Sequence, residues 1–356
     1  MSAPALLFVP ASGAQGSGEY YRSLAIARAA QARWPAARIC FIVNSAAGYA
    51  RQCPFETVLV EGSPTYNTAA VNATIDRMKP DIVVFDSAGR VGQLAHARRR
   101  HAATVYVSSR FKTRWKGFRL RRMRVMDHHW LAWPRLLEGE LNRWERFKLR
   151  LLGRPRAVFL DPVFEPVVPE RAAALRRELG VGEERYLLFC AGGGGYERSG
   201  VPAPETFARA AIEVNRACSL KTLWVKGPNY EGGNFDNAGI LALPALRPDQ
   251  MTDLLAGAHV ATINGGSLLL QALALHTPAV AAPVAGDQPG RISACERQGV
   301  AVGASLDPTS LAETTLALLG DGQRLAQLRA RLDAAGLGNG SLQAVEAMEQ
   351  LLERRR

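Results

Sequence analysis

A glycine-rich stretch that carries a carboxylate is the first place where this chain can do chemistry. Residues 10–28 read PASGAQGSGEYYRSLAIAR and follow the apolar run ALLFV. A strand that breaks into glycines before a helix is a common phosphate site, because free backbone N–H groups point at the ligand. Here Glu19 stands where an anionic ligand would bind. A carboxylate with a raised pKa is a competent general base, so we predict that role for Glu19. The alternative is a glutamate that stabilises a helix start.

Two other carboxylates are candidates for the same role. Asp86 ends the apolar run DIVVFD and ranks second as the base; Asp127, in MRVMDHHW, ranks third. His128 and His129 beside it lack the H-x-x-x-H spacing and a carboxylate at ligand spacing, so no metal site is predicted. We expect Gly16, Gly18, Arg22 and Asp127 to contact the acceptor, that is, the substrate from which this base would take a proton.

A second glycine run, AGGGGYE (191–197), follows the apolar run RYLLF. Residues without a Cβ atom let backbone N–H groups approach a phosphate closely, whereas the alternative is a flexible surface turn. Lys226, at the end of LKTLWVKG, can add positive charge toward the same ligand. The predicted phosphate-binding residues of this run are Gly192, Gly193, Gly194 and Gly195.

Two further loops supply groups of the same kind. Gly265, Gly266 and Ser267 begin an apolar helix, whose first N–H groups are free; Ser267 also suits a simple helix cap. The loop 285–288, which contains Asp287 and Gln288, follows PAVAAPV. Arg291 comes next, and a guanidinium pairs with two phosphate oxygens at once. We predict that Arg291 binds a diphosphate, with a solvated salt bridge as the alternative.

These loops need a scaffold, and the order of apolar runs predicts one. Short β-rich runs alternate with helical patterns twice along the chain, which predicts α/β architecture with two doubly wound parallel sheets facing a cleft. The proline-rich stretch LDPVFEPVVPE (160–170) predicts a linker between the halves. We expect a first domain at 1–160, a second at 161–340 and a C-terminal helix at 341–356. Ligands of such sheets bind outside the carboxyl ends of the strands, where the glycine loops lie.

The stretch NGGSLLLQALALHTPAVAAPVAGDQPGRISACERQGVAVG (264–303) resembles the donor domain of GT-B glycosyltransferases. The nearest likeness is to the enzymes that add N-acetylglucosamine to the lipid intermediate of peptidoglycan. Matching spacing is found for Gly265, Pro278, Pro283 and Gln288. The loop GSGEYYRSLAIA is also similar to that of a GT-B-like UDP-sugar hydrolase of pseudaminic acid synthesis. The resemblance implies a GT-B fold of two Rossmann-like domains, with the first on the acceptor side and the second binding a nucleotide-sugar.

This chain departs from the family pattern at two positions. The carboxylate that grips the donor ribose is replaced by Gln271, whose amide can still hydrogen-bond one hydroxyl; a half-exposed helix residue is the alternative. An asparagine of the family is replaced by Arg291. The resemblance also implies that Gln288 contacts the donor sugar, and that a histidine of the hydrolase loop corresponds to Glu19.

Positive charge gathers in one segment of the chain. Of a formal net charge of +12, residues 98–156 hold 18 lysines and arginines against four acidic residues. Aromatic and leucine residues lie between the cations at helical spacing: Leu137, Leu141, Trp144, Phe147 and Leu151. An amphipathic helix on an anionic membrane surface is the first interpretation. A helix packed on its own sheet is the second, and nucleic-acid binding is the third.

The leading function is therefore an inverting, metal-independent transfer from a nucleotide-sugar, with a UDP-sugar favoured. The acceptor is expected to be anionic or lipid-linked, as in envelope polysaccharide or glycolipid assembly. Five scattered cysteines without CxxC spacing, together with the lack of a signal-like start or a long apolar run, indicate a cytoplasmic protein, peripheral at most on the membrane. The alternatives are a nucleotide-sugar hydrolase and a non-catalytic subunit of a transferase complex. No cofactor besides the nucleotide-sugar co-substrate is expected.

Overall fold

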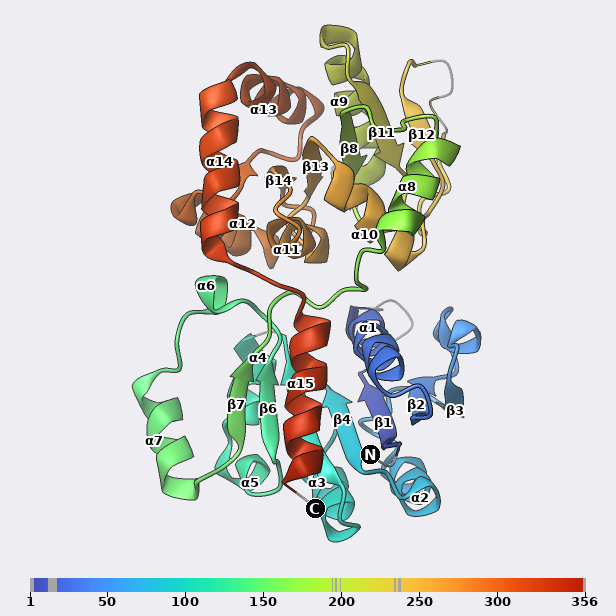
Figure 1. The fold of residues 1–356 in the computed structure, drawn as a ribbon, viewed down its shortest axis with the longest axis vertical. Helices are drawn as coiled ribbons and strands as arrows, with labels where there is room; N and C mark the ends of the chain where they lie inside the picture. The colour runs from blue at the N-terminus through green and yellow to red at the C-terminus, as the bar shows by residue number, and fades with distance from the viewer. Residues whose placement is uncertain are drawn as a thin grey trace. The chain divides into compact units, whose positions relative to one another are not determined.

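The chain forms two compact units, seen in a computed structural model that describes residues 3–11, 18–109, 111–193, 195, 197–198, 200–233, 235 and 238–354 (Figure 1). Unit 1 comprises Met1–Glu165 and Asn339–Arg356, and unit 2 comprises Pro166–Gly338. The first division falls within the proline-rich stretch 160–170. The C-terminal helix, which the sequence analysis set apart, is part of unit 1.

Unit 1 is built on a seven-stranded parallel sheet with the order β3-β2-β1-β4-β5-β6-β7. The first strand pairs with both β2 and β4, so the chain reverses its direction of travel across the sheet at β1, as in a doubly wound fold. The strands are β1 (Ala5–Pro10), β2 (Arg38–Asn44), β3 (Glu56–Val60), β4 (Ile82–Asp86), β5 (Ala103–Ser108), β6 (His128–Leu131) and β7 (Arg156–Phe159).

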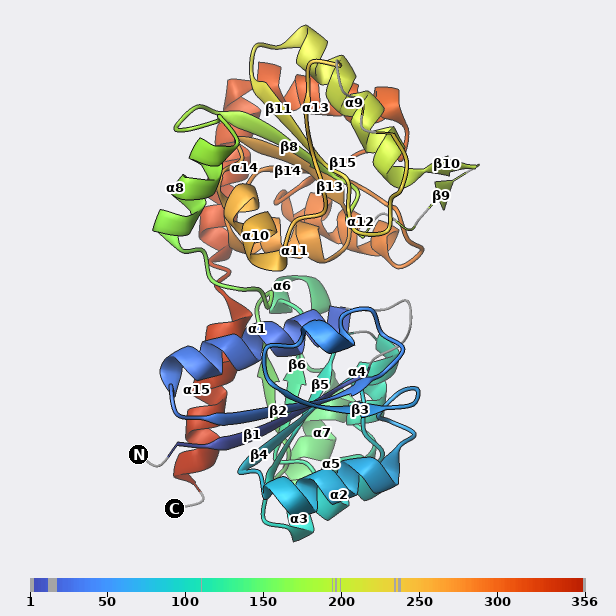
Figure 2. The ribbon, with the colours of Figure 1, turned by 90° about the vertical axis from the view of Figure 1, so that its right-hand side faces the viewer.

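Helices cover both faces of this sheet (Figure 2). Alternate residues of β1 point to opposite faces: Leu6 and Phe8 join a core with α1 and α15, whereas Leu7 joins a core with α2 and α3. Because both faces are covered, β1 is apolar without interruption. The helices are α1 (Gly18–Arg33), α2 (Thr68–Met78), α3 (Val91–Arg99), α4 (Phe111–Gly117), α5 (Leu120–Met123), α6 (Arg135–Glu138), α7 (Arg143–Leu152) and α15 (Gly340–Glu353), with a 3-10 turn at Ala50–Gln52.

Unit 2 has a six-stranded parallel sheet with the order β12-β11-β8-β13-β14-β15, and a small antiparallel pair, β9 and β10. Its strands are β8 (Tyr186–Cys190), β9 (Glu197–Arg198), β10 (Val201–Pro202), β11 (Lys221–Val225), β12 (Leu241–Leu243), β13 (Val260–Asn264), β14 (Ala279–Ala282) and β15 (Val302–Gly303). Its helices are α8 (Pro169–Glu178), α9 (Ala203–Ala217), α10 (Pro248–Gly257), α11 (Ser267–Ala274), α12 (Gln288–Gln298), α13 (Pro308–Gly320) and α14 (Gly322–Ala335).

The basic segment differs from the single amphipathic helix that its spacing predicts. Gly139, with φ +73°, ends α6, and α7 begins only at Arg143. Leu141, between the two helices, packs against the core of unit 1, whereas Trp144 on α7 is exposed. The apolar positions of the pattern therefore serve two different surfaces. No helix among the described residues is long and apolar enough to cross a membrane.

Candidate functional site

Three glycine-bearing loops meet at one edge of unit 2. Strands β8, β13 and β14 are neighbours and run parallel, so their carboxyl ends lie at the same edge of the sheet. The loops that leave these ends begin at Ala191, Gly265 and Pro283. The predicted donor residues, apart from Lys226 at the end of β11 and Gln271 within α11, belong to these loops or to the helix starts that follow them.

Asn264, the last residue of β13, ties the first two loops together. Its Nδ2 donates to the carbonyl of Ala191 at 2.8 Å, and its Oδ1 accepts from the backbone N–H of Gly266 at 3.0 Å. The chain approaches so closely here that a Cβ atom on Gly192, whose φ is +89°, would overlap the Asn264 amide. Asn264 was not among the predicted site residues. Its signal is an asparagine directly before two glycines at a strand end, a position typical of side-chain-to-backbone turns.

Gly193 and Gly195 lie beside the loop after β11. The carbonyl of Gly193 accepts from the backbone N–H of Asn229 at 3.0 Å, and Gly195 is exposed. Gly194 lies outside the described residues. Lys226, half-buried at the end of β11, has its Nζ 5.9 Å from the ring centroid of Trp224.

Gly265 is required by the packing of α12, and Gly266 by the close approach of the Asn264 side chain. A Cβ atom on Gly265 would lie 2.6 Å from Cδ1 of Ile292, and one on Gly266 would lie 2.9 Å from Oδ1 of Asn264. Gly266 is the N-cap of α11, and Ser267 is its first, exposed residue. Because the first N–H groups of a helix have no partner within it, this end can receive an anion.

The two polar side chains at the start of α12 hold the loops. Nη1 of Arg291 donates to the carbonyl of Gly265 at 2.5 Å and Nη2 donates to Oδ2 of Asp287 at 3.0 Å, and the residue is only 8% exposed. Oε1 of Gln288 accepts from the backbone N–H of Val284 at 2.8 Å. Arg291 therefore links the loop after β13 to Asp287 in the loop after β14. Its contact with a diphosphate stays a prediction.

Gln271 lies on the second turn of α11 and is half-buried. A cavity of about 370 Å³ lies next to the β14 loop, lined by residues that include Pro283, Pro289 and the hydroxyl-bearing Ser293 and Ser305. Space and hydroxyl groups are therefore present beside the loop that carries Gln288.

In unit 1 the carboxyl edge holds charged side chains. Asp86 is fully buried at the end of β4 and accepts from Nε of Arg22 at 2.9 Å and from Nη2 at 2.6 Å. Ser23 Oγ adds a bond of 3.3 Å to the same carboxylate, and Arg22 Nη2 lies 3.4 Å from Ser109 Oγ. Burial raises the pKa of Asp86 to about 6, although Arg22 opposes this shift. At neutral pH the pair is therefore ionised.

Glu19 lies one turn before Arg22 in the first turn of α1 and is half-buried. Its charge contributes to raising the pKa values of Arg22 and Asp86, so the three groups share one local field. Gly18 is the first residue of α1, and Gly16 lies outside the described residues. The structure thus brings Glu19, Arg22 and Asp86 together.

Asp127 lies elsewhere. It directly precedes β6, so it is at the amino edge of the sheet, opposite the edge of Glu19. Its Oδ2 accepts from the backbone N–H of Thr104 at 2.9 Å, and its Oδ1 from Arg154 at 3.2 Å. The structure does not bring Asp127 together with the other predicted acceptor residues. These bonds fix the starts of β5 and β6.

The adjacent histidines are core residues. Nε2 of His129 lies 2.9 Å from Ser108 Oγ, and Gly117 backs so closely onto the ring that a Cβ atom there would overlap it. Burial lowers the pKa of His129 to about 3 and that of His128 to about 4. Within the described ranges no cluster of three His, Cys, Asp or Glu side chains could hold a metal ion.

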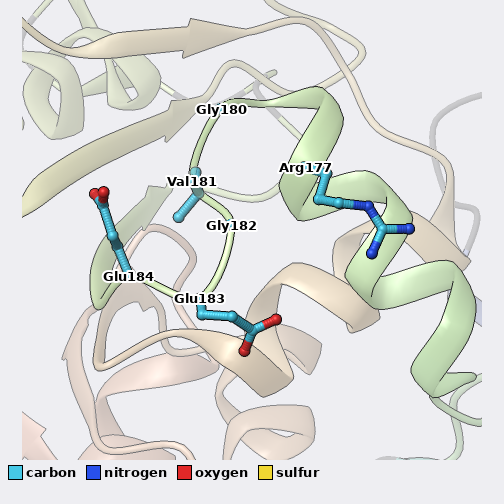
Figure 3. A pocket seen from close by; sticks show the side chains of 6 residues that line it. All are labelled: Arg177, Gly180, Val181, Gly182, Glu183 and Glu184. Atoms are coloured by element: carbon cyan, nitrogen blue, oxygen red, sulfur yellow. The ribbon is translucent and has the colours of Figure 1, made fainter.

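A larger hollow, of about 520 Å³, lies at the turn between α8 and β8 (Figure 3). It is at the amino end of β8, and its charged side chains, Arg177, Glu183 and Glu184, do not point toward one another. A binding site needs a few convergent polar groups, so this hollow is not a candidate.

Neither a protein-family profile nor a curated protein matches this sequence. Solved structures are similar over almost the whole chain. The glycotransferase of kitacinnamycin is 17% identical and has a TM-score of 0.64, covering 99% of this chain and 100% of its own. CalG4, the calicheamicin glycosyltransferase, is 18% identical with a TM-score of 0.63, covering 99% of both. The glycosyltransferase SnogD from Streptomyces nogalater is 15% identical with a TM-score of 0.63, covering 98% and 100%. The predicted α/β fold of two Rossmann-like domains is thereby confirmed as one that this chain shares with glycosyltransferases.

Proposed function

We propose that this protein is a glycosyltransferase that moves a sugar from a nucleotide-sugar, with a UDP-sugar favoured, to an acceptor that is anionic or lipid-linked. One observation carries the proposal: three glycine-bearing loops meet at the carboxyl edge of unit 2, in a fold shared with solved glycosyltransferases. Nucleotides bind to doubly wound sheets at this edge.

The donor diphosphate is proposed to lie on the backbone N–H groups of Gly193 and the start of α11. The turn at Gly192 lies beside them, and its own N–H donates to Sγ of Cys190 at 3.3 Å. A helix N-terminus carries a partial positive charge, and Arg291 and Lys226 add full charges. We propose that these groups stabilise the departing diphosphate in place of a metal ion. Gln271 is assigned to a ribose hydroxyl and Gln288 to the donor sugar.

Glu19 is proposed as the base of an inverting transfer. Its carboxylate takes the proton of the acceptor hydroxyl while that oxygen attacks the anomeric carbon, and the bond to the diphosphate oxygen breaks. A single displacement of this kind inverts the anomeric configuration. We assign Asp86 a supporting role, because both of its oxygens accept hydrogen bonds from Arg22. Arg22, with its side chain 15% exposed, is proposed to meet an anionic group of the acceptor.

The acceptor class also suggests where the protein works. A lipid-linked acceptor of envelope polysaccharide or glycolipid assembly lies in a bilayer, and nucleotide-sugars are donors on its cytoplasmic side. All five cysteines are free thiols, as is typical of a cytoplasmic protein. We therefore propose a cytoplasmic protein that is peripheral to the inner face of the membrane.

The test is a thermal-shift and calorimetric titration with nucleoside diphosphates and nucleotide-sugars. Binding should raise the melting temperature by mass action. Arg291→Ala should weaken binding by about 1.5–3 kcal/mol, the contribution of a charge-assisted hydrogen bond. Arg297→Ala, on the same helix but exposed, is the matched control and should bind as the wild type does.

Each outcome has a defined meaning. Unchanged affinity in Arg291→Ala would remove Arg291 from the site. Lack of binding by any nucleotide would contradict the proposed function and favour a non-catalytic subunit. Release of free sugar and nucleoside diphosphate without an acceptor would instead indicate a hydrolase, in which Glu19 activates water.

A further inference from the structure

Helix α7 in unit 1 presents large apolar side chains to solvent. Trp144 is 73% exposed, Phe147 55% and Leu151 62%, and they lie at i, i+3 and i+7, so they share one side of the helix. The rings of Trp144 and Phe147 meet edge to face at 6.1 Å. We define the α7 outer face by these residues and the exposed arginines that alternate with them: Arg143, Trp144, Arg146, Phe147, Arg150 and Leu151.

The opposite side of α7 is firmly held. Glu145 is buried and accepts from Nε of Arg114 on α4 at 3.0 Å and from Nη2 at 2.8 Å. Lys148 Nζ donates to the carbonyl of Phe118 at 3.1 Å, and Leu149 packs against the core. Asn142 and Glu145 form a reciprocal capping box at the helix start. The inner side of α7 therefore holds the helix in place, and the α7 outer face takes no part in these contacts.

Charge on this face has one sign. The only acidic residue of α7 is Glu145, which is buried against Arg114. For Arg143, Arg146 and Arg150 the structure shows no ion pair with any residue that it describes. Exposed aromatic and leucine side chains among unpaired arginines are the composition of a helix that lies in the interface of an anionic bilayer. There the apolar groups enter the boundary of the acyl chains while the guanidinium groups meet lipid phosphates.

We propose that the α7 outer face docks unit 1 on an anionic lipid bilayer. A second copy of this face is a poor partner, because six arginines would be brought together. Nucleic acid is disfavoured because Leu151, at the end of the face, has no ring to stack on a base. The inference rests on α7 alone and stands whether or not the chain transfers a sugar.

Vesicle co-sedimentation tests the proposal with the full chain. Wild-type protein should bind vesicles of phosphatidylcholine with phosphatidylglycerol and should not bind phosphatidylcholine alone. Salt at 1 M should release it, because the Debye length falls to about 3 Å. The triple variant Arg143→Glu, Arg146→Glu, Arg150→Glu should lower the partition coefficient by about 100-fold or more, since each arginine near an anionic surface contributes roughly fivefold.

Two further variants decide between local and bulk effects. Replacing three exposed arginines elsewhere, as Arg99→Glu, Arg177→Glu and Arg297→Glu, changes the net charge equally and should preserve most binding. Replacing the apolar groups, as Trp144→Ser, Phe147→Ser and Leu151→Ser, should lower partitioning at least about tenfold at low salt, because the buried apolar area is lost. Unfolding midpoints of all variants confirm that they fold.

Three results would overturn the proposal. The first is equal binding to neutral and anionic vesicles. The second is equal loss in the two arginine triple variants, which would mean that bulk charge alone is responsible. The third is unchanged binding in the apolar triple variant. Binding of a single-stranded oligonucleotide that is lost with Arg143, Arg146 and Arg150 would assign the face to nucleic acid instead.

Discussion

The carboxyl edges of the two sheets carry different kinds of chemical group. In unit 1 the edge is held by a buried ion pair between Arg22 and Asp86, with Glu19 one turn away. In unit 2 polar side chains hold the backbone of the loops: Asn264 bonds to the carbonyl of Ala191 and to the N–H of Gly266. Arg291 bonds to the carbonyl of Gly265 and to Asp287. The same edge therefore carries a half-buried titratable side chain, Glu19, in unit 1 and closely packed glycine loops in unit 2.

The difference follows from the residues in the loops and helix starts that come after the strands. A residue without a Cβ atom lets a neighbouring backbone come close, and that serves a bulky anion such as a diphosphate. A half-buried carboxylate next to the Arg22–Asp86 pair, as Glu19 is, offers oxygens that can accept a proton. We therefore propose general-base chemistry for unit 1 and anion binding for unit 2, and the following experiments test the two units.

Glu19→Gln should have the largest effect. The change keeps the shape of the side chain and removes its ability to accept a proton, so turnover should fall by about 10²–10⁴ while donor affinity stays within about twofold. Glu170→Gln, also in the first turn of a helix, is the control and should leave turnover intact. If Glu19→Gln is active and lowers stability by about 0.3–1 kcal/mol, Glu19 only stabilises the helix start.

Asp86→Asn should destabilise unit 1 strongly. It leaves the guanidinium of Arg22 in a largely buried place without its anion, which costs about 3–5 kcal/mol for buried pairs. Urea unfolding measures the loss. Glu56→Gln breaks an exposed ion pair with Arg77 and should cost less than about 1 kcal/mol. Similar losses in both variants would mean that the buried Arg22–Asp86 pair contributes no more to stability than the exposed Arg77–Glu56 pair.

Acid should weaken unit 1 through its buried histidines. Burial lowers the pKa values of His128 and His129 to about 4 and about 3, whereas both titrate near 6.5 when unfolded. Below pH 6.5 the unfolded chain therefore binds more protons than the folded chain, and the free energy of unfolding decreases as the pH is lowered. Asp86 has the opposite effect on stability. Its pKa is raised to about 6 in the folded chain, so the folded chain binds this proton at a higher pH than the unfolded chain does.

Two histidines outweigh one carboxyl group. Lowering the pH from 7 to 5 should reduce the free energy of unfolding by about 2–3 kcal/mol, measured in urea at both pH values. The double variant His128→Gln, His129→Gln should lose this decrease. Equal stability of the wild type at both pH values would show that the histidines are not shielded from solvent protons.

Gly192→Ala tests the backbone side of the comparison. The new Cβ atom would overlap the Asn264 amide at a φ of +89°, so we expect a loss of about 1–3 kcal/mol in stability. Affinity for UDP should fall with it. Gly286→Ala, where no heavy atom lies within 4 Å, is the matched control and should change neither quantity measurably. Equal behaviour of the two variants would show that the close approach of the loop to Asn264 is not needed.

Much of the donor-side arrangement was predictable. Glycines directly after apolar runs predicted that Gly192 and Gly265 lie at strand ends, since strand and turn residues are local signals. The Arg22–Asp86 pair was not predictable, because 64 positions separate the two residues. The bonds of Arg291 to Gly265 and Asp287 were not predictable either, and its contact with a diphosphate stays a prediction.

The sequence by itself determined the two parallel sheets and the positions of their loops, because periodicity and turn chemistry act over a few residues. The tertiary structure decided which charges are paired and which apolar residues are covered. Leu141 and Trp144 share one pattern, yet after the turn at Gly139 the first is half-buried against the core and the second is exposed to solvent. Burial and pairing depend on neighbours that are distant along the chain, so only the folded arrangement fixes them.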